Sequence, residues 1–277
     1  MAVSAIVLFV VACSKDEKPE IYPVNEDIVL KDAAYGDHHQ QRMDIYLPAG
    51  RSPDLTKIVV FIHGGGWSGG DKDDFQLADE SVRVLKETFP GFALFNINYR
   101  LVSGSSNQYP AAEEDIKRAL AYIYSTLESY QLSSATYVIG GSAGAHLAAL
   151  HTLKYNSNDR IKGCIAISGV YNLVSLYHMG STEAKEVVTA FMGGAPVERA
   201  TPYEQATPVN FITPSSAKFL ILHGLEDNLV PVSQAYELRD ALAEQQVDHT
   251  VFTYPGGHGI PPEHLVEAFG YITDFLQ

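Results

Sequence analysis

Several features are scarce in this 277-residue sequence, and each scarcity excludes a class of protein. Lysine and arginine number 19 against 33 aspartates and glutamates, and a net charge of -14 disfavours binding to nucleic-acid phosphates. The unbroken apolar run over residues 1–12 is shorter than the roughly 20 residues of a membrane-spanning helix. No Pro/Gly/Ser-rich tract is long enough to be a linker, and no internal repeat occurs. With 46% hydrophobic residues, one domain with a large core is expected.

The N-terminal apolar run is typical of a secretory leader. It ends at Cys13 and is followed by the charged residues 14–18, and Val10–Cys13 resembles a bacterial lipobox. We therefore predict a signal peptide over 1–12, a flexible tether over 13–26 and a folded domain over 27–277. Lipid on Cys13 would be the only membrane attachment. The protein would then be a periplasmic or outer-membrane lipoprotein, and exposure at the cell surface is included in this prediction. No Lys or Arg precedes the run, and a strand packed on the domain is the alternative.

From residue 27 onward, short β-branched runs alternate with longer helical patterns, which predicts βαβ units and a mostly parallel sheet. Asp44–Leu47 alternates like an edge strand, whereas the later apolar runs suit central strands covered on both faces. The predicted central strands are 58–62, 93–97, 136–139, 164–168 and 219–222, and the predicted helices are 75–88, 111–129, 143–154, 183–192, 232–245 and 262–276. Cys164 lies within the apolar run of the predicted strand 164–168, and we expect it to be a small core residue.

Gly140-Gly141-Ser142-Ala143-Gly144 follows one predicted strand directly and precedes a predicted helix. This is the G-x-S-x-G pattern in the setting where small residues allow a sharp turn and the serine hydroxyl projects. The helix N-terminus would favour a developing oxyanion. Ser142 is the candidate nucleophile, and a plain strand-to-helix turn is the alternative interpretation.

His63-Gly64-Gly65-Gly66-Trp67 follows the predicted strand 58–62. Three consecutive glycines are poor in helices and strands, so they indicate a backbone that approaches another group closely. The N–H groups of Gly65 and Gly66, together with that of Ala143, are candidates for an oxyanion hole. His63 is expected to brace this loop.

These motifs resemble the α/β-hydrolase superfamily, in particular esterases related to hormone-sensitive lipase and, more closely, bacterial acetyl-xylan and feruloyl esterases. The resemblance covers nearly the whole chain after the leader. It is carried by the two glycine motifs and by five further stretches: Gln41–Pro48, Gly69–Lys72, Asn98–Leu101, Tyr109–Ala112 and Ser168–Tyr171. It implies an α/β-hydrolase fold with a mostly parallel central sheet flanked by helices.

The resemblance also implies an acid after a late strand and a histidine near the C-terminus. The family spacing H-G-x-x-D-x-x-V-P falls on Asp227 rather than the neighbouring Glu226. His258 lies in the glycine-rich stretch 254–259, on a loop with the freedom to reach a serine from another strand. Ser142, His258 and Asp227 would then form a catalytic triad.

Other aromatic and histidine residues suggest the surroundings of the site. Trp67 and Tyr171 are expected to offer aromatic surfaces to a substrate, whereas core packing is an equal alternative for Tyr99. His146 is expected to pack or hydrogen-bond on the helix after Ser142. The adjacent His38 and His39 lack a third ligand, so no metal and no cofactor is predicted.

The segment between residues 168 and 219 holds one predicted helix and turn-rich stretches, which predicts a small lid over an open, shallow cleft. Taken together, the sequence predicts a serine carboxylesterase that removes short acyl groups, acetyl or feruloyl, from small molecules or plant polysaccharides. An amidase, peptidase or formamidase on the same fold is an alternative. A non-catalytic carbohydrate-binding protein is another.

Overall fold

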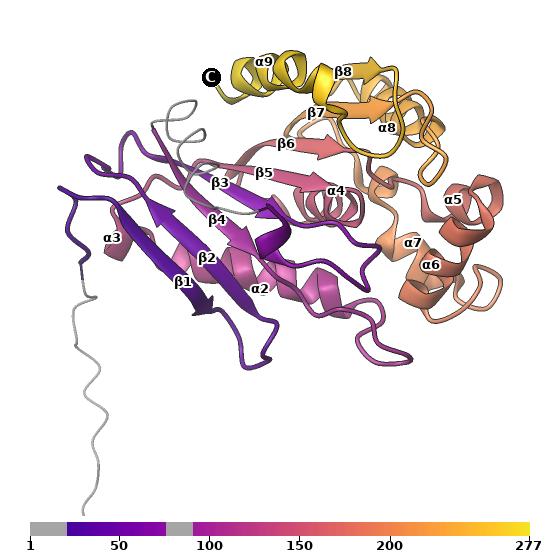
Figure 1. The fold of residues 1–277 in the computed structure, drawn as a ribbon, viewed down its shortest axis with the longest axis horizontal. Helices are drawn as coiled ribbons and strands as arrows, with labels where there is room; N and C mark the ends of the chain where they lie inside the picture. Colours follow the sequence, from indigo (N-terminus) through magenta and orange to yellow (C-terminus); the bar gives the residue numbers. More distant parts are fainter. Residues whose placement is uncertain (1–20, 76–90) are drawn as a thin grey trace, which may run out of the picture.

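An eight-stranded sheet forms the centre of the computed structural model, which describes residues 21–75 and 91–277 (Figure 1). The strand order is β1-β2-β4-β3-β5-β6-β7-β8, and β2 alone runs against the others. The strands are β1 (Ile28–Ala34), β2 (Arg42–Leu47), β3 (Lys57–Ile62), β4 (Phe92–Ile97), β5 (Thr136–Gly141), β6 (Ile161–Ile167), β7 (Lys218–Gly224) and β8 (His249–Tyr254). The predicted mostly parallel sheet is thus confirmed.

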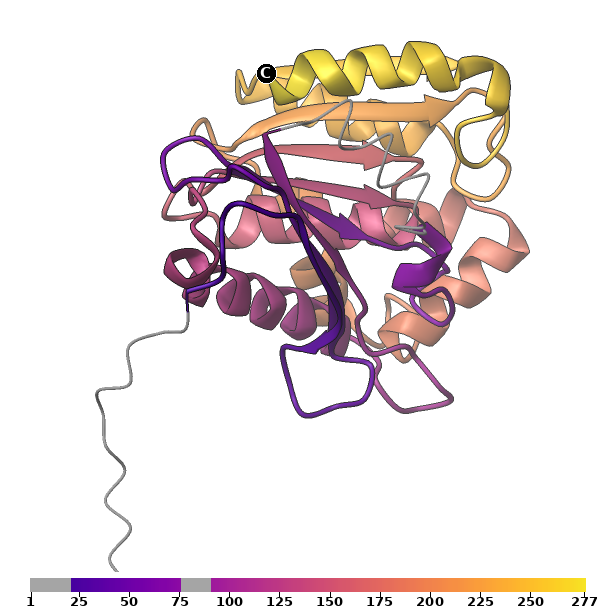
Figure 2. The same ribbon diagram turned by 60° about the vertical axis from the view of Figure 1, so that its left-hand side comes forward.

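Helices cover both faces of this sheet, as Figures 1 and 2 show from two sides. Apolar side chains of α2, α4 and α8 pack into the larger core on one face, and those of α9 pack into a second core on the other. The helices of these layers are α2 (Ala111–Ser125), α3 (Leu127–Tyr130), α4 (Ala143–Tyr155), α8 (Ser233–Glu244) and α9 (Leu265–Leu276), with short 3₁₀ turns at η1 (Lys72–Phe75), η2 (Pro208–Phe211) and η3 (Pro262–His264).

The continuous apolar runs are explained by burial on both faces. In β3, Ile58, Val60 and Ile62 join the larger core, whereas Val59 and Phe61 join the other. Successive side chains of a strand point to opposite faces, so a strand covered on both sides needs apolar residues at every position.

The edge of the sheet differs from the prediction. Asp44–Leu47 lies within β2, which is paired on both sides, and β1 forms the edge instead. The burial pattern of β1 is mixed, with only intermediate and exposed residues, which made the strand hard to recognise from its sequence. Asp44 is buried in β2 and forms an ion pair with Lys31 of β1, with Nζ 2.7 Å from Oδ2.

The N-terminal predictions meet the structure only in part. The signal segment 1–12 and Cys13 lie outside the described residues, as does nearly all of the helix predicted at 75–88, so these stay predictions. Residues 22–26, assigned to the tether, are held on the domain: Arg51 donates to the carbonyl groups of Tyr22, Pro23 and Glu26. The ordered domain thus begins before residue 27. None of the described helices is long and apolar enough to cross a membrane.

The lid between β6 and β7 has more helices than predicted. It contains three helices rather than one: α5 (Leu173–Met179), α6 (Thr182–Met192) and α7 (Ala200–Ala206). The two unpredicted helices are each seven residues long, which gives too few turns for a clear helical period. Figure 1 shows the three together at one end of the sheet, beyond the tip of β6.

Candidate active site

The sheet register brings the three motif loops to one edge. Ile62 at the end of β3 pairs with Gly140, and Gly141 pairs with Ile167 at the end of β6. The loops that follow β3, β5 and β6 therefore begin side by side at the carboxyl ends of parallel strands, where functional groups of such sheets gather. The loops after β7 and β8 start at the same edge, because Gly224 pairs with Tyr254.

Ser142 occupies a strained turn between β5 and α4. Its φ of 53° and ψ of -119° lie outside the regions that an L-residue prefers. The turn requires glycine on both sides: a Cβ on Gly140 would lie 2.3 Å from the carbonyl oxygen of Gly144, and one on Gly144 would lie 2.1 Å from that of Ile62. This close approach gives the G-x-S-x-G spacing its physical reason and projects the serine from the sheet.

Asp227 and His258 form a hydrogen-bonded pair between the loops after β7 and β8. His258 Nδ1 lies 2.7 Å from Asp227 Oδ2, and Oδ1 accepts the N–H groups of Leu229 and Val230 at 3.0 and 2.8 Å. Burial raises the pKa of Asp227, but hydrogen bonds from His223, His258 and Val230 outweigh it and hold the pKa well below its usual range. An ionised Asp227 fixes the Nδ1–H tautomer of His258 and leaves Nε2 free to accept a proton.

The buried His223 also contacts Asp227. Its Nε2 lies 2.8 Å from the carbonyl oxygen of Val230 and 3.5 Å from Asp227 Oδ2, and its side chain is fully buried. The shorter contact identifies Nε2–H as a donor to Val230, with a weaker contribution to Asp227. The resemblance motif contained this histidine, but its role was not predicted.

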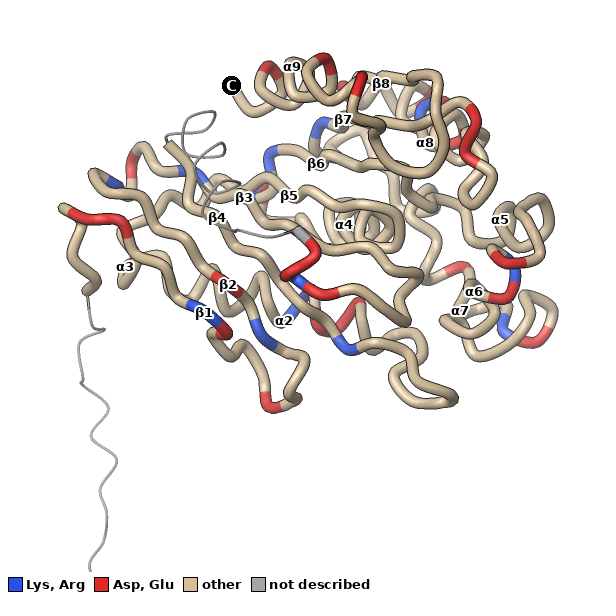
Figure 3. The backbone as a smooth tube through the Cα atoms, in the orientation of Figure 1, with Lys and Arg blue, Asp and Glu red and all other residues tan. Residues whose placement is uncertain are grey.

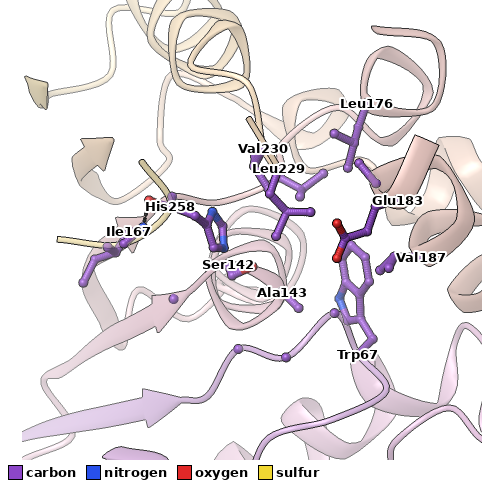
Figure 4. A pocket seen from close by; sticks show the side chains of 18 of the residues that line it. Trp67, Ser142, Ala143, Ile167, Leu176, Glu183, Val187, Leu229, Val230 and His258 are labelled. Atoms are coloured by element: carbon purple, nitrogen blue, oxygen red, sulfur yellow. Dashed lines mark hydrogen bonds between the residues drawn. The ribbon is translucent and has the colours of Figure 1, made fainter. Parts of the chain in front are cut away.

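Ser142 and His258 line the same cavity of about 520 Å³ (Figure 4). The His258 side chain is 29% exposed, so its ring faces this space while Asp227 behind it is buried. Within the described ranges no hydrogen bond joins the two side chains. Such contacts in enzymes often tighten only when substrate binds. The geometry thus unites all three predicted triad residues at one cavity.

The predicted oxyanion donors line this cavity beside Ser142. Gly65 and Gly66 have φ values of 97° and 58°, a region that favours glycine. Across residues 21–75 and 91–277, the N–H groups of Gly65, Gly66 and Ala143 have no protein acceptor. They are therefore open to an incoming carbonyl oxygen, as an oxyanion hole requires.

Replacing Gly65 with valine is expected to lower turnover of an ester substrate by about 10² or more. A Cβ on Gly65 would lie 2.2 Å from the carbonyl oxygen of Gly69, so the loop must shift and misplace its donors. Steady-state kinetics on 4-nitrophenyl acetate measure the effect. Gly50→Val is the matched control, because Gly50 also has positive φ (75°) but meets no atom within 4 Å. Equal turnover in both variants would contradict the assignment of the donors.

A buried aromatic and histidine cluster fixes the glycine loop. The rings of His63 and Tyr99 stack at 4.4 Å, and the Tyr99 hydroxyl donates to the carbonyl oxygens of His63 and Gly64 at 3.1 and 3.2 Å. Trp67 Nε1 donates to His146 Nδ1 at 3.2 Å. Burial lowers the pKa of His146 to about 4, so the ring is neutral and can accept this bond. His63 thus braces the loop, and His146 packs and hydrogen-bonds in the core.

The two residues predicted to contact substrate differ in position. Trp67 lines the cavity but is only 2% exposed, because its ring stacks on Phe191 at 4.3 Å. Tyr171 is fully buried and does not line the cavity, so its assignment as a substrate-contacting residue is wrong. The chain turns inward after β6: the Tyr171 N–H donates to Gln234 Oε1 at 2.8 Å, which points the ring into the core.

Two residues that hold His258 in place were not predicted. Ser168 Oγ accepts the N–H of Gly259 at 3.1 Å, and the Tyr254 hydroxyl donates to the carbonyl oxygen of Gly259 at 3.1 Å. Gly259 is thereby fixed at both of its polar groups, which limits the freedom of a glycine-rich loop. The sequence did contain a signal, because Ser168 begins one of the stretches that carried the resemblance.

The acidic loop after Gly70 is tied to the sheet by ion pairs. Lys72 is buried, and its Nζ lies 3.1 Å from Asp32, 3.4 Å from Asp44 and 3.2 Å from Asp73. Figure 3 shows such acidic segments in red along the backbone. The ion pairs attach the end of the glycine loop to β1 and β2.

For the residues that the structure describes, no group of three or more His, Cys, Asp or Glu side chains could hold a metal, and this includes His38 and His39.

Comparison with known proteins identifies sequence relatives of this chain. The chain is 29% identical to kynurenine formamidase of Danio rerio over 150 residues, which is 52% of this chain and 47% of that protein. It is 30% identical to the probable carboxylic ester hydrolase LipM of Mycobacterium tuberculosis over 239 residues, which is 80% of this chain and 53% of that protein. The chain thus spans about half the length of these curated relatives.

Solved structures show the same fold. A truncated carbohydrate esterase from gut microbiota superposes with a TM-score of 0.77 at 22% identity, covering 92% of this chain and 97% of that one. The BD-FAE family model matches residues 43–242, which is most of the described domain. The chain therefore belongs to the BD-FAE family and has the α/β-hydrolase fold.

Proposed function

We propose that the protein is a serine carboxylesterase that removes short acyl groups, acetyl or feruloyl, from plant polysaccharides or small molecules. The observation that carries this proposal is the joint placement of Ser142, the Asp227–His258 pair and three open N–H groups around one cavity. A non-catalytic carbohydrate-binding protein has no need for this combination. Names of relatives with ester hydrolase activity give further support.

The reaction would be acyl transfer to water. His258 Nε2 takes the proton of Ser142 as its oxygen attacks the ester carbonyl, while the Gly65, Gly66 and Ala143 N–H groups stabilise the oxyanion. The alcohol leaves with the proton from His258, and water then hydrolyses the acyl-enzyme by the same route. Asp227 stabilises the imidazolium in both steps. No cofactor takes part in these steps.

The cavity supports a substrate of moderate acyl size. A volume of about 520 Å³ lies within the range of small-ligand sites and exceeds what an acetyl group fills. The lining residue Glu183 carries a carboxylate into this space, and a long alkyl chain would desolvate it at a cost. Acetyl, butyryl and aromatic acyl groups therefore suit the cavity better than chains of ten carbons.

A formamidase is the second candidate, because one of the relatives carries that name. The two functions share the nucleophile, base and oxyanion donors, so the triad itself does not separate them. A formyl group is one methyl smaller than an acetyl group, so the cavity volume does not separate these two acyl groups. The relative rates on ester and N-formyl substrates decide between the two functions.

A substrate panel tests the proposal. We expect the specificity constants for 4-nitrophenyl acetate and butyrate, methyl ferulate and acetylated xylan to exceed that for an N-formyl arylamide by at least about tenfold. Within the 4-nitrophenyl series the specificity constant should fall beyond about eight carbons, because a longer chain desolvates the Glu183 carboxylate. Methylenes that remain outside the cavity add none of the roughly 0.8 kcal/mol that burial of each would give.

Three outcomes of the panel would contradict the proposal in different ways. A specificity constant that kept rising to ten and twelve carbons would indicate a lipase. Faster hydrolysis of the N-formyl arylamide than of any ester would indicate a formamidase. Saturable binding of xylan without hydrolysis of any substrate would indicate a binding protein.

A further inference from the structure

Glu183 brings a carboxylate into the cavity that contains Ser142. It lies in the first turn of α6, where the side chain of Ser181 caps the helix by accepting the N–H of Ala184 at 3.1 Å. In Figure 4 the carboxylate points between Leu229 and Trp67 into the open space. Its side chain has no hydrogen bond or ion pair to any residue within 21–75 or 91–277. Glu183 is exposed and lines a largely apolar cavity, so its carboxylate is available to a ligand.

Helix α6 is packed directly on the glycine loop that carries Gly65 and Gly66, which we call the oxyanion loop. A Cβ on Gly66 would lie 3.0 Å from Cγ1 of Val187, so the two segments are in contact. Residues four apart in a helix lie on the same face, and Glu183 therefore shares the cavity-facing side of α6 with Val187. The carboxylate is thus held by a helix of eleven residues rather than by a loop.

The position of His258 identifies which part of an ester meets Glu183. His258 comes from β8 on one side of Ser142, while Trp67 follows β3 on the other side. Figure 4 likewise shows Ser142 between His258 and the group formed by Glu183, Trp67 and Val187. Because His258 must reach the leaving oxygen, the alcohol lies on its side. The acyl group extends toward Glu183.

We propose that Glu183 is a specificity-determining residue that accepts a hydrogen bond from a hydroxyl group at the far end of an aromatic acyl group. This inference rests on the proposed esterase function. The walls on this side are apolar, with Leu176, Val187 and Leu229 beside the Trp67 ring, and they suit a planar aromatic body. A carboxylate accepts hydrogen bonds and donates none, so it favours a phenolic hydroxyl and repels a second carboxylate.

A purely structural role for Glu183 must be separated from this one. An acidic side chain in the first turn of a helix interacts favourably with the helix dipole and stabilises the helix, so its removal could weaken α6. That effect would change all substrates alike. A role in recognition instead changes the ratio between substrates that differ at a single group, and it does so in opposite directions for a donor and an anion.

The test compares methyl 4-hydroxycinnamate, methyl cinnamate and methyl 4-carboxycinnamate, which differ only at the para position. In the wild-type protein the specificity constant should rank hydroxy above unsubstituted above carboxy. In Glu183→Leu the ratio of hydroxy to unsubstituted ester should fall about tenfold, because the acceptor is lost. In Glu183→Gln the carboxy ester should gain relative to the unsubstituted ester, because the repulsion is removed while an acceptor oxygen remains.

Glu186→Gln is the matched control. Glu186 lies on the same helix and is exposed like Glu183, but it does not line the cavity, so its variant should keep all three wild-type ratios. Ratios that stay unchanged in Glu183→Leu, or that change equally in Glu186→Gln, would overturn the assignment. Activity on 4-nitrophenyl acetate distinguishes the two proposals: its presence in the wild-type protein with unchanged ratios removes only the role of Glu183, whereas its absence removes the esterase function as well.

Discussion

Replacement of Ser142 by alanine is expected to lower ester hydrolysis by about 10⁴-fold or more while the protein stays folded. The hydroxyl is the only nucleophile that the strained turn projects beside His258, so no acyl-enzyme can form without it. Residual catalysis would come from the open N–H groups and from binding. Single-turnover measurements with 4-nitrophenyl acetate should lose the burst of 4-nitrophenol.

Ser168→Ala provides the comparison for Ser142→Ala. Ser168 also lines the cavity, but its Oγ accepts the N–H of Gly259 and acts on the position of His258 rather than on the substrate. It should reduce turnover far less than Ser142→Ala, and the burst should remain. Thermal unfolding of both variants checks that they fold. Near-wild-type turnover in Ser142→Ala would refute the nucleophile.

Replacement of Asp227 by asparagine is expected to lower turnover by about 10⁴-fold with little change in KM. The N–H groups of Leu229 and Val230 keep the amide oxygen at the Oδ1 position, so the NH₂ group must face His258 Nδ1. Nδ1 then becomes an acceptor and the ring proton moves to Nε2. A protonated Nε2 cannot take the proton of Ser142.

The neighbouring Glu226 supplies the control for Asp227→Asn. Glu226 is exposed, whereas the carboxylate of Asp227 is buried against His258, so Glu226→Gln should leave turnover near the wild-type value. Steady-state kinetics on one ester substrate compare the two variants directly. A larger loss in Glu226→Gln than in Asp227→Asn would assign the role of the acid to Glu226 and refute the assignment to Asp227.

Burial and hydrogen bonding give two titratable groups near the cavity different charge states. Asp227 is ionised behind His258, whereas His146 is kept neutral by burial and serves only to hold Trp67. Two groups that titrate in water thus have fixed and different states in the protein. These two environments thus hold the Trp67 ring and the Asp227–His258 pair in place.

The sequence by itself determined the parts of this protein that depend on local sterics. Gly140 and Gly144 are required by contacts within one strand-to-helix turn, so their spacing identified the elbow around Ser142. The alternation of apolar strands with helices determined the mostly parallel sheet, because strands buried on both faces need apolar residues at every position. The motif spacing of the α/β-hydrolases pointed to Asp227 and His258, which the structure joins at 2.7 Å.

Only the tertiary structure decided which residues face the cavity and which face the core. Tyr171 and Glu183 both follow β6, yet the first is fully buried and the second lines the cavity, because Gln234 and the oxyanion loop position their segments from remote parts of the chain. The edge position of β1 and the three-helix lid were likewise set by partners distant in sequence. Burial depends on what packs against a segment, and local periodicity in short elements carries no record of those partners.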